Sequence, residues 1–387
     1  MSTSEEDQFE ILENKEPEKE SAWVDEDDAQ PKVIRTQQYE EVWKHKEVKD
    51  ELSEEDKELL KIDPNAPKTS TPHEIPMRRF DETVPLLRSH KGPVTTCQFH
   101  QTDNVLMTGG YDNLLHFYRM EGYKVNPILD ARVPFRVETG RYLDDENVVA
   151  LSGKHSFFTY NMRRDASTTF EKTFTPGQLI TRLAVGNQYV AMLNDKQMTT
   201  PLLDKKSLQV VENLRSSTQF LSMAFHPTEN VLVMTGSKAS ISVWDLRKMR
   251  CRAMLTDEGS INTMSVAFSP DGNYISCGST GGIVNIYEWK DIEKSNTPTP
   301  FHSFNNLVYD CTHIVSTNSL LLMSTWKGEN QLKLGNIQNK FTYSNFPGFA
   351  GLGKVQESTI SPHSAYVASG RSGGRVALFR LLDYNNY

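Results

Sequence analysis

The sequence predicts an all-β protein, a seven-bladed β-propeller preceded by a mostly disordered acidic N-terminal arm. From residue 83 onward, short β-rich runs alternate with turn clusters, and no long helical period appears. The alternation repeats about every 43–44 residues, a spacing typical of one four-stranded propeller blade. Residues 1–80 hold 23 of the 50 Asp and Glu residues but only 12 of the 42 Lys and Arg residues, so the acidity belongs to the arm.

The arm, residues 1–80, has the composition of a disordered chain with short docking segments. It is rich in Glu, Lys, Asp and Pro, and it has too few apolar side chains to offset the entropy of ordering. The stretch "SEEDKELLKI" (53–62) predicts one short helix, because Ser53 and Asp56 form a partial capping box. Four prolines indicate a stiff, extended linker after it: Pro64, Pro67, Pro72 and Pro76.

The propeller domain, 83–387, divides into seven repeats with the period of WD40 proteins. Repeats four, five and seven are clear and the first is good, whereas the second, third and sixth are placed partly by spacing. The repeats are 83–122, 123–165, 166–207, 208–250, 251–296, 297–340 and 341–387. The recurring unit contains a strand that ends in an aromatic stretch. These strands are predicted at 114–120, 155–162, 241–247, 284–290 and 376–382.

The stretch "ISVWDLR" (241–247) contains the Trp-Asp pair from which WD40 repeats take their name. Along a strand, Ile241 and Val243 point to one face and Trp244 to the other. We expect the flat ring of Trp244 to fill the wedge between two blades, and we assign Trp244 and Asp245 structural roles. In WD40 repeats, a histidine and an aspartate at the positions of His90 and Asp112 tie the blade loops to its third strand, a structural role rather than a catalytic one.

The two ends of the propeller are predicted to meet in one blade. The last repeat ends on the inner strand "VALFRLL" (376–382), with no outer strand after it. The segment "TVPLL" (83–87) precedes the first full repeat and is expected to supply that outer strand. Pro85 is acceptable there because an outer edge needs fewer hydrogen-bond donors.

The residues give no support for catalysis. The stretch from Gly348 to Lys354 spells the start of a phosphate-binding loop, but Val355 stands where a Ser or Thr must hold magnesium. The residues after it alternate like strands and offer no helix N-terminus to a phosphate. Ten histidines are scattered without metal-ligand spacing. We therefore expect no enzyme activity, no cofactor and no bound metal.

The first ten residues and the four cysteines indicate the cellular compartment. The first ten residues are acidic and polar, unlike a signal or transit peptide. No apolar run approaches the ~20 residues that a membrane span requires, so no membrane partner is expected. The four cysteines lie far apart, as expected for free thiols in a reducing compartment. The chain is therefore expected in the cytosol or the nucleus.

Three stretches go beyond generic WD40 sequence: "SAWVDEDDAQ" (21–30), residues 256–289, and the C-terminal residues 360–387. Together with "NLVYDCT" (306–312), they resemble the family of U3 small nucleolar RNA-associated protein 18, WD40 components of the small-subunit processome. The resemblance implies a nucleolar scaffold that supports cleavage of precursor ribosomal RNA and maturation of 18S RNA. It also implies other processome WD40 proteins, U3 RNA and precursor ribosomal RNA as partners in the particle, and leaves direct RNA contact open.

Some members of this family recruit the exosome helicase through an N-terminal Leu-Phe-x-apolar-Asp motif. This chain has Phe9 and Ile11 in the matching stretch, but Gln8 stands in place of Leu and Leu12 in place of Asp. The resemblance therefore does not extend recruitment of the exosome helicase to this chain.

The acidic segment around a lone tryptophan is the candidate partner-binding motif. We expect Trp23 to anchor in a partner, since a buried Trp is a frequent interface hot spot, while the carboxylates meet basic residues. The alternative is a solvated acidic run with an incidental Trp. The candidate residues are Trp23, Val24, Asp25, Glu26, Asp27 and Asp28.

Two groups of basic residues are candidate contacts for RNA phosphates. Arg247, Lys248, Arg250 and Arg252 crowd one connection, and Arg371 and Arg375 flank glycines in the last repeat. The alternative is ordinary solvated surface charge.

The stretch "WDLR" (244–247) also resembles the WDxR signature of substrate receptors of cullin-RING ubiquitin ligases, in which the Arg helps dock an adaptor. That class of function is the main alternative to the processome scaffold.

Overall fold

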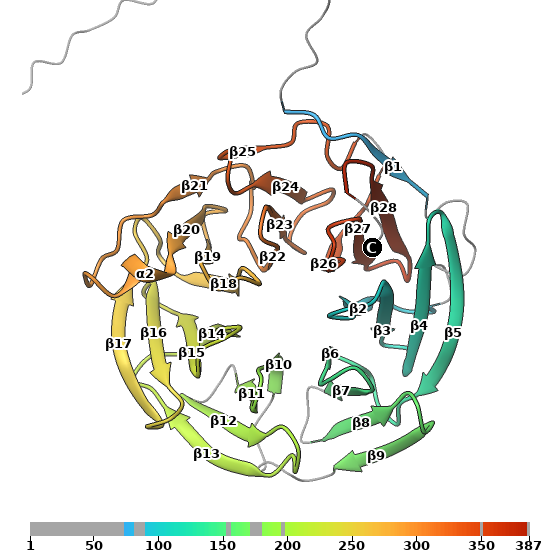
Figure 1. Ribbon diagram of the computed structural model, residues 1–387, viewed down its shortest axis with the longest axis horizontal. Helices are drawn as coiled ribbons and strands as arrows, with labels where there is room; N and C mark the ends of the chain where they lie inside the picture. Colours follow the sequence, from blue (N-terminus) through green and yellow to red (C-terminus); the bar gives the residue numbers. More distant parts are fainter. Residues whose placement is uncertain are drawn as a thin grey trace, which may run out of the picture. The chain divides into compact units, whose positions relative to one another are not determined.

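Seven four-stranded antiparallel sheets surround a central axis in the computed structural model (Figure 1). The structure describes residues 73–80, 90–151, 156–170, 180–194, 198–348 and 351–384. The predicted all-β, seven-bladed WD40 propeller is confirmed. The helix predicted at 53–62 lies outside the described residues.

In blades 1 to 6 the four strands follow one another in sequence from the axis outward. Blade 1 contains β2 (Val94–Phe99), β3 (Val105–Gly110), β4 (Leu114–Glu121) and β5 (Lys124–Arg132). Blade 2 contains β6 (Thr139–Tyr142), β7 (Asn147–Leu151), β8 (Phe157–Asn161) and β9 (Ala166–Phe170). Blade 3 contains β10 (Ile180–Val185), β11 (Tyr189–Asn194), β12 (Thr199–Asp204) and β13 (Val210–Arg215). Blade 4 contains β14 (Phe220–Phe225), β15 (Val231–Gly236), β16 (Ser240–Asp245) and β17 (Arg250–Thr256).

The remaining blades carry one helical turn and the closure of the ring. Blade 5 contains β18 (Thr263–Phe268), β19 (Tyr274–Ser279), β20 (Val284–Glu288) and β21 (His302–Phe304), with α2 (Trp289–Ile292) before the last strand. Blade 6 contains β22 (His313–Ser316), β23 (Leu320–Ser324), β24 (Leu332–Asn336) and β25 (Phe341–Thr342). Blade 7 contains β26 (Val355–Ile360), β27 (Tyr366–Arg371), β28 (Val376–Leu381) and β1 (Met77–Arg79). No helix among the described residues has the length and apolar character to cross a bilayer.

The predicted repeats match the blades with a constant offset. The repeats that start at residues 123, 166 and 251 begin within one residue of β5, β9 and β17, each the outer strand of a blade. Repeats two to seven therefore each supply the outer strand of one blade and the three inner strands of the next, whereas the first repeat supplies only β2, β3 and β4. This overlap links neighbouring blades covalently and explains why the sequence period and the blade are the same length.

Apolar clusters fill the wedges between consecutive blades. Trp244 on β16 packs with Leu202 and Leu214 of blade 3, whereas Ile241 and Val243 pack with residues of blade 5. This is the alternation expected of "ISVWDL", because successive side chains on a strand point to opposite faces. Both faces of an inner strand are thus buried.

The ring closes through an earlier segment than the sequence suggested. β1 pairs with β28, with Met77 opposite Leu381 and Arg79 opposite Phe379. The expectation that residues 83–87 form this strand is wrong, and those residues lie outside the described part of the chain. Ile75 and Phe80, both buried, anchor the two ends of β1 in apolar clusters on either side of blade 7. Residues 73–80, assigned to the arm from composition, therefore belong to the propeller.

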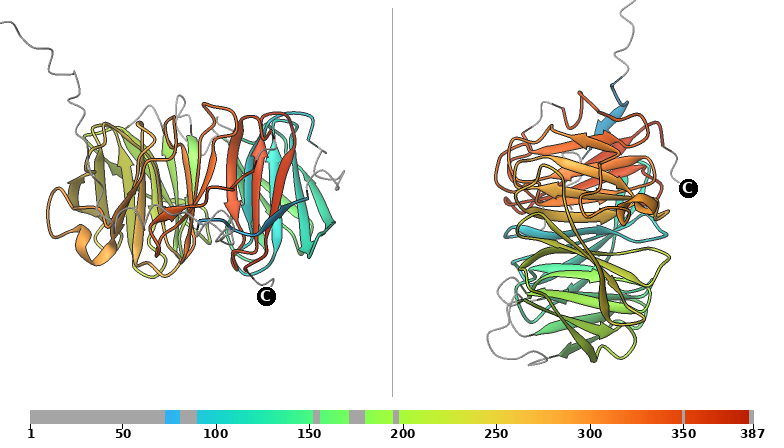
Figure 2. Two further views of the ribbon diagram at one scale, coloured as in Figure 1. Left: turned by 90° about the horizontal axis from the view of Figure 1, so that it is seen from above. Right: turned by 90° about the vertical axis from the view of Figure 1, so that its left-hand side faces the viewer.

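The two faces of the ring are defined by the antiparallel order of each blade. The upper face carries the connections into each blade and the turns between its second and third strands. The lower face carries the turns between first and second strands and between third and fourth strands. The left panel of Figure 2 shows the ring edge-on, with the C-terminal end of the chain, which follows the third strand of blade 7, at the lower face.

Candidate functional site

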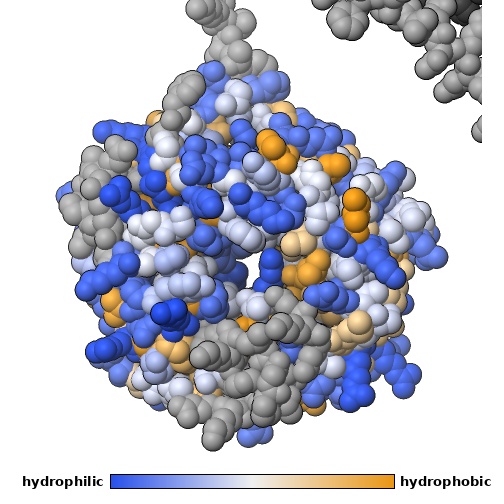
Figure 3. Space-filling model, turned by 180° about the vertical axis from the view of Figure 1, so that it is seen from behind, coloured by the Kyte–Doolittle hydropathy of each residue, from blue (hydrophilic) through white to orange (hydrophobic). Residues whose placement is uncertain are grey.

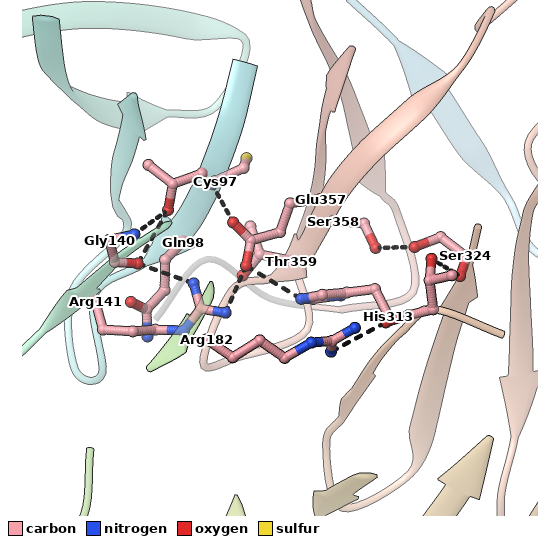
Figure 4. Close-up of polar contacts among 12 residues, drawn as sticks. Cys97, Gln98, Gly140, Arg141, Arg182, His313, Ser324, Glu357, Ser358 and Thr359 are labelled. Atoms are coloured by element: carbon pink, nitrogen blue, oxygen red, sulfur yellow. Dashed lines mark hydrogen bonds and ion pairs between the residues drawn. The ribbon is translucent and has the colours of Figure 1, made fainter. Parts of the chain in front are cut away.

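A polar network lies at the centre of the ring, where the first strands of the blades meet (Figure 4). Its hub is the buried Glu357 of β26, in blade 7. The Glu357 carboxylate accepts a 2.9 Å hydrogen bond from the backbone N–H of Cys97 in β2. It also lies 2.5 Å from Arg141 Nη2 in β6 and 3.1 Å from His313 Nε2 in β22. One carboxylate therefore joins blades 6, 7, 1 and 2.

The charge state of Glu357 follows from these neighbours. Burial by itself raises the pKa of Glu357, but the Arg141 charge and the His313 hydrogen bond outweigh burial and lower that pKa to about 2. The carboxylate therefore stays ionised at neutral pH. Burial and the Glu357 charge raise the pKa of the Cys97 thiol, so Cys97 stays protonated and is not an activated nucleophile.

The channel wall continues this pattern of internal pairing. Arg182 of blade 3 donates a 3.4 Å hydrogen bond from Nη1 to the carbonyl oxygen of Thr312, and Ser324 and Ser358 are joined by a 2.9 Å hydrogen bond. Figure 4 shows the side chain of Arg141 pointing toward Glu357 and that of Arg182 pointing toward the segment that carries His313. These bonds cross between blades, so the network holds the closed ring together rather than presenting a reacting group.

The predicted His–Asp pair lies in blade 1. His90 Nδ1 is 2.9 Å from an Asp112 carboxylate oxygen, and its Nε2 is 2.9 Å from Thr108 Oγ1 on β3. Asp112 also accepts the backbone N–H of Lys91, at 3.3 Å. These contacts join the connection into blade 1, its second strand and the turn that precedes its third strand, which is the geometry a structural role requires.

A third side chain, His116 on β4, was not singled out from the sequence. With His90 and Asp112 it forms a group whose potential ligand atoms all lie within 4.8 Å of one another. His116 Nδ1 is 2.5 Å from Asp130, and the His90 and His116 rings meet edge to face with centroids 4.6 Å apart. His90 and Asp112 already bond one another, so we read the group as a hydrogen-bonded cluster within blade 1.

The structure separates the two predicted basic groups. Arg247 and Lys248 lie in the turn between β16 and β17, on the lower face, where Asp245 Oδ1 accepts their backbone N–H groups at 2.8 and 3.4 Å. Arg252 pairs with Glu293, and Arg250 is exposed.

The second basic group lies in blade 7. Arg371 and Arg375 flank the turn between β27 and β28, on the upper face. The two groups therefore lie on opposite faces of the ring and cannot form one continuous patch. The candidate partner-binding residues 23–28 lie outside the described part of the chain.

Sequence reasoning also missed an exposed aromatic group on the upper face. Trp326 lies in the turn between β23 and β24, and Tyr309 lies in the connection between β21 and β22. Their side chains are 50% and 45% exposed, respectively. Exposed aromatics in a turn are a usable signal, because turn geometry favours Gly, Asn, Asp and Pro and gives no reason for a large ring. Figure 3 shows this face, on which hydrophobic groups interrupt a mainly hydrophilic surface around the central opening.

Comparison with known proteins supports the sequence-based resemblance. The family model "WD domain, G-beta repeat" matches residues 82–119, 209–245 and 249–288. The chain is 25% identical over 309 residues to the U3 small nucleolar RNA-associated protein 18 homolog of Mus musculus, covering 76% of this chain and 55% of that protein. It is 26% identical over 370 residues to the homolog of Drosophila melanogaster, covering 89% and 71%.

A plant relative gives the same result. The U3 small nucleolar RNA-associated protein 18 homolog of Arabidopsis thaliana is 26% identical over 310 residues, covering 76% of this chain and 55% of that protein. The resemblance to proteins named U3 small nucleolar RNA-associated protein 18 is therefore confirmed. The chain spans about half the length of the mouse and Arabidopsis relatives.

Proposed function

We propose that this WD40 propeller is a scaffold of the small-subunit processome, without catalytic activity of its own, that supports cleavage of precursor ribosomal RNA and maturation of 18S RNA. The observation that carries the proposal is the similarity to proteins named U3 small nucleolar RNA-associated protein 18 in animals and plants, which extends over most of the propeller. The nucleolus is the compartment that this role requires.

The geometry favours binding over chemistry. The buried charges at the centre of the ring are paired with one another across blades, and the Cys97 thiol beside them has a raised pKa. What the ring offers is a rigid frame with loops on two faces, and loops on a rigid frame are where binding residues concentrate. Partners are other WD40 proteins of the particle together with U3 RNA and precursor ribosomal RNA.

The arm adds a second binding element to the proposal. Trp23 anchors in a partner protein, and the acidic residues 25–28 meet basic side chains of that partner. Replacing Trp23 by Ala is expected to weaken association of the full chain with the particle. Unchanged association would remove the arm from the proposal and leave the propeller as the binding element.

Affinity purification of the tagged full chain, with identification of its partners, tests the function. We expect U3 RNA and processome WD40 proteins, nucleolar staining, and accumulation of uncleaved 18S precursor on depletion. If the chain instead recovers cullin machinery, and the Arg247→Ala variant does not, the result would support the alternative function as a substrate receptor of a cullin-RING ubiquitin ligase. Arg247 is exposed on the lower face, so this variant tests docking without disturbing the core.

A further inference from the structure

The aromatic group on the upper face rests on a fixed platform. A Cβ atom at Gly328 would lie 2.5 Å from Tyr309 Cε2, so the Tyr309 ring packs directly against the turn that contains Trp326. An ion pair between Lys327 and Asp310 joins the same two segments. The two half-exposed rings therefore belong to connected loops, and each retains surface that no neighbour covers.

This turn continues into the connection before blade 7. Asn330 Oδ1 accepts the backbone N–H groups of Leu352 and Gly353, at 2.6 and 3.2 Å, and Glu329 forms an isolated bridge with Lys354. Lys354, which is exposed, is thus paired through its backbone with the turn that contains Trp326.

The connection is joined in turn to the basic turn of blade 7. The backbone N–H of Ser372 donates to the Lys354 carbonyl at 3.1 Å, and Arg371 Nη2 donates to the Gly351 carbonyl at 3.0 Å. One backbone and one side-chain hydrogen bond therefore join the segment of Lys354 to the turn that carries Arg371 and the exposed Arg375.

The same turn reaches blade 1. A Cβ atom at Gly374 would lie 2.4 Å from the His90 carbonyl oxygen, so the turn lies against the connection that carries the exposed Lys91. That connection meets Tyr111, whose hydroxyl donates to Glu138 at 3.2 Å and whose ring lies 5.9 Å from the Arg136 guanidinium. Loops of blades 5, 6, 7, 1 and 2 thus form one continuous strip, which we call the upper strip.

The composition of the upper strip is that of a single-stranded nucleic-acid site. Exposed aromatic rings stand at both ends, where bases can stack, and cations lie between them, where phosphates can bind. The cations Lys91, Arg136, Lys354, Arg371 and Arg375 outnumber the acidic Glu138 and Glu329, whereas Asp310 is paired with Lys327 and Asp112 with His90. Stacking requires unpaired bases, so a duplex would use only the charges.

We propose that the upper strip binds single-stranded RNA, with Trp326 and Tyr309 stacking on bases and with Lys354, Arg371 and Arg375 contacting phosphates. The inference rests on the proposed function, because it names RNA as the partner of one face of the ring. It assigns Arg371 and Arg375 to this contact and excludes the lower-face group of Arg247 and Lys248 from it.

The test uses the purified full chain and a fluorescein-labelled single-stranded RNA of mixed sequence, about 16 nucleotides long, the upper range for one binding module. Binding is measured by anisotropy at several salt concentrations. Trp326→Ala is expected to weaken binding about tenfold, the typical loss for one stacked base. The double variant Lys354→Gln/Arg375→Gln is expected to reduce the slope of log affinity against log salt by about 1.4, since each phosphate contact contributes about 0.7.

The matched control is Arg247→Gln/Lys248→Gln, which removes the same amount of charge from the lower face. It should leave both affinity and salt slope unchanged, and the upper face should keep its fold, as checked by thermal unfolding of each variant. An equal loss in the lower-face variant, no binding by the unmodified chain, or equal competition by duplex RNA would each overturn the proposal.

Ile261→Ala separates RNA binding from protein docking on the same face. Ile261 is exposed on the upper face, and its loss should not change RNA affinity. If Trp326→Ala and Ile261→Ala both leave RNA affinity intact but weaken recovery of a processome protein, the upper strip binds protein instead. Purification of the particle with the Trp326→Ala variant separates the proposed scaffold function from the proposed RNA contact. If the variant loses RNA binding but still recovers the particle, the scaffold function does not depend on this contact.

Discussion

Local hydrogen bonds hold turns on both faces of the ring, but the upper face also carries exposed side chains that take no part in such bonds. On the lower face, acidic side chains bond the N–H groups of their own turns: Asp144 with Glu146 and Asn147, and Asp245 with Arg247. Asp204 and Asp271 do the same in blades 3 and 5. On the upper face, Ser279 and Thr325 accept N–H groups of their own turns in the same way, but Trp326, Tyr309 and Arg375 make no such local bond among the described contacts. Residues that turn chemistry does not explain are therefore the better candidates for partner contact.

The largest effect on stability is expected from the Glu357 network at the centre of the ring, between the two faces. Glu357→Gln leaves Arg141 without its counter-charge, and we expect a loss of about 3 kcal/mol in the free energy of unfolding at pH 7, the equivalent of a pKa lowered from 4.5 to about 2. Because the pKa is lowered in the folded state, this contribution is complete above about pH 4.5 and is lost as the pH falls toward 2.

Chemical denaturation at pH 7 and at pH 3 measures this difference between the unmodified chain and Glu357→Gln. The gap between the two proteins should narrow at the lower pH. Glu329→Gln, an exposed carboxylate on the upper face, is the control and should change stability little. A gap that stays constant with pH would mean that the Glu357 carboxylate contributes nothing as a charge.

The next largest effect on stability concerns the contact between the turn of Gly374 and the connection that carries His90, within the upper strip. Gly374 has φ of 74°, and a side chain there would collide with the His90 carbonyl. Gly374→Ala should therefore cost about 2 kcal/mol of stability, measured by urea denaturation. Gly373→Ala next to it meets no atom within 4 Å and serves as the matched control. Equal effects at both positions would show that the two loops are not in contact.

A smaller effect is expected from the turn bonds of the lower face. Asp245→Ala removes the acceptor for two backbone N–H groups, and we expect a loss of about 1 kcal/mol in the free energy of unfolding. RNA affinity should be unchanged, since the turn lies on the face opposite to the upper strip. A drop in RNA affinity at constant stability would reverse the assignment of the two faces.

The smallest effect on stability should come from the residue with the greatest effect on binding. Trp326→Ala removes a half-exposed ring outside the apolar clusters, and we expect a change within about 0.5 kcal/mol in thermal unfolding. Combined with loss of RNA binding, that result would show that Trp326 on the upper face serves binding and not stability. A large loss of stability would instead make Trp326 a packing residue.

The sequence by itself determined the blades. Third strands were located at 114–120, 241–247 and 376–382, and β4, β16 and β28 occupy those positions. Even the degenerate sixth repeat, placed by spacing, contains four strands, β21 to β24. These features depend on alternation along a strand and on turn residues within one repeat, so they are encoded locally. Local sequence also argued against a phosphate-binding loop at 348–354, and Val355 begins the strand β26 where such a loop would lead into a helix.

Only the tertiary structure decided what closes the ring and what its faces offer. β1 displaced the segment expected at 83–87 because Ile75 and Phe80 bury on either side of blade 7, and those pockets exist only once the ring is formed. The Glu357 hub joins residues more than two hundred positions apart, and the upper strip is assembled from loops of five blades. No period within a 43-residue repeat encodes such contacts, since they arise where the first and last blades meet.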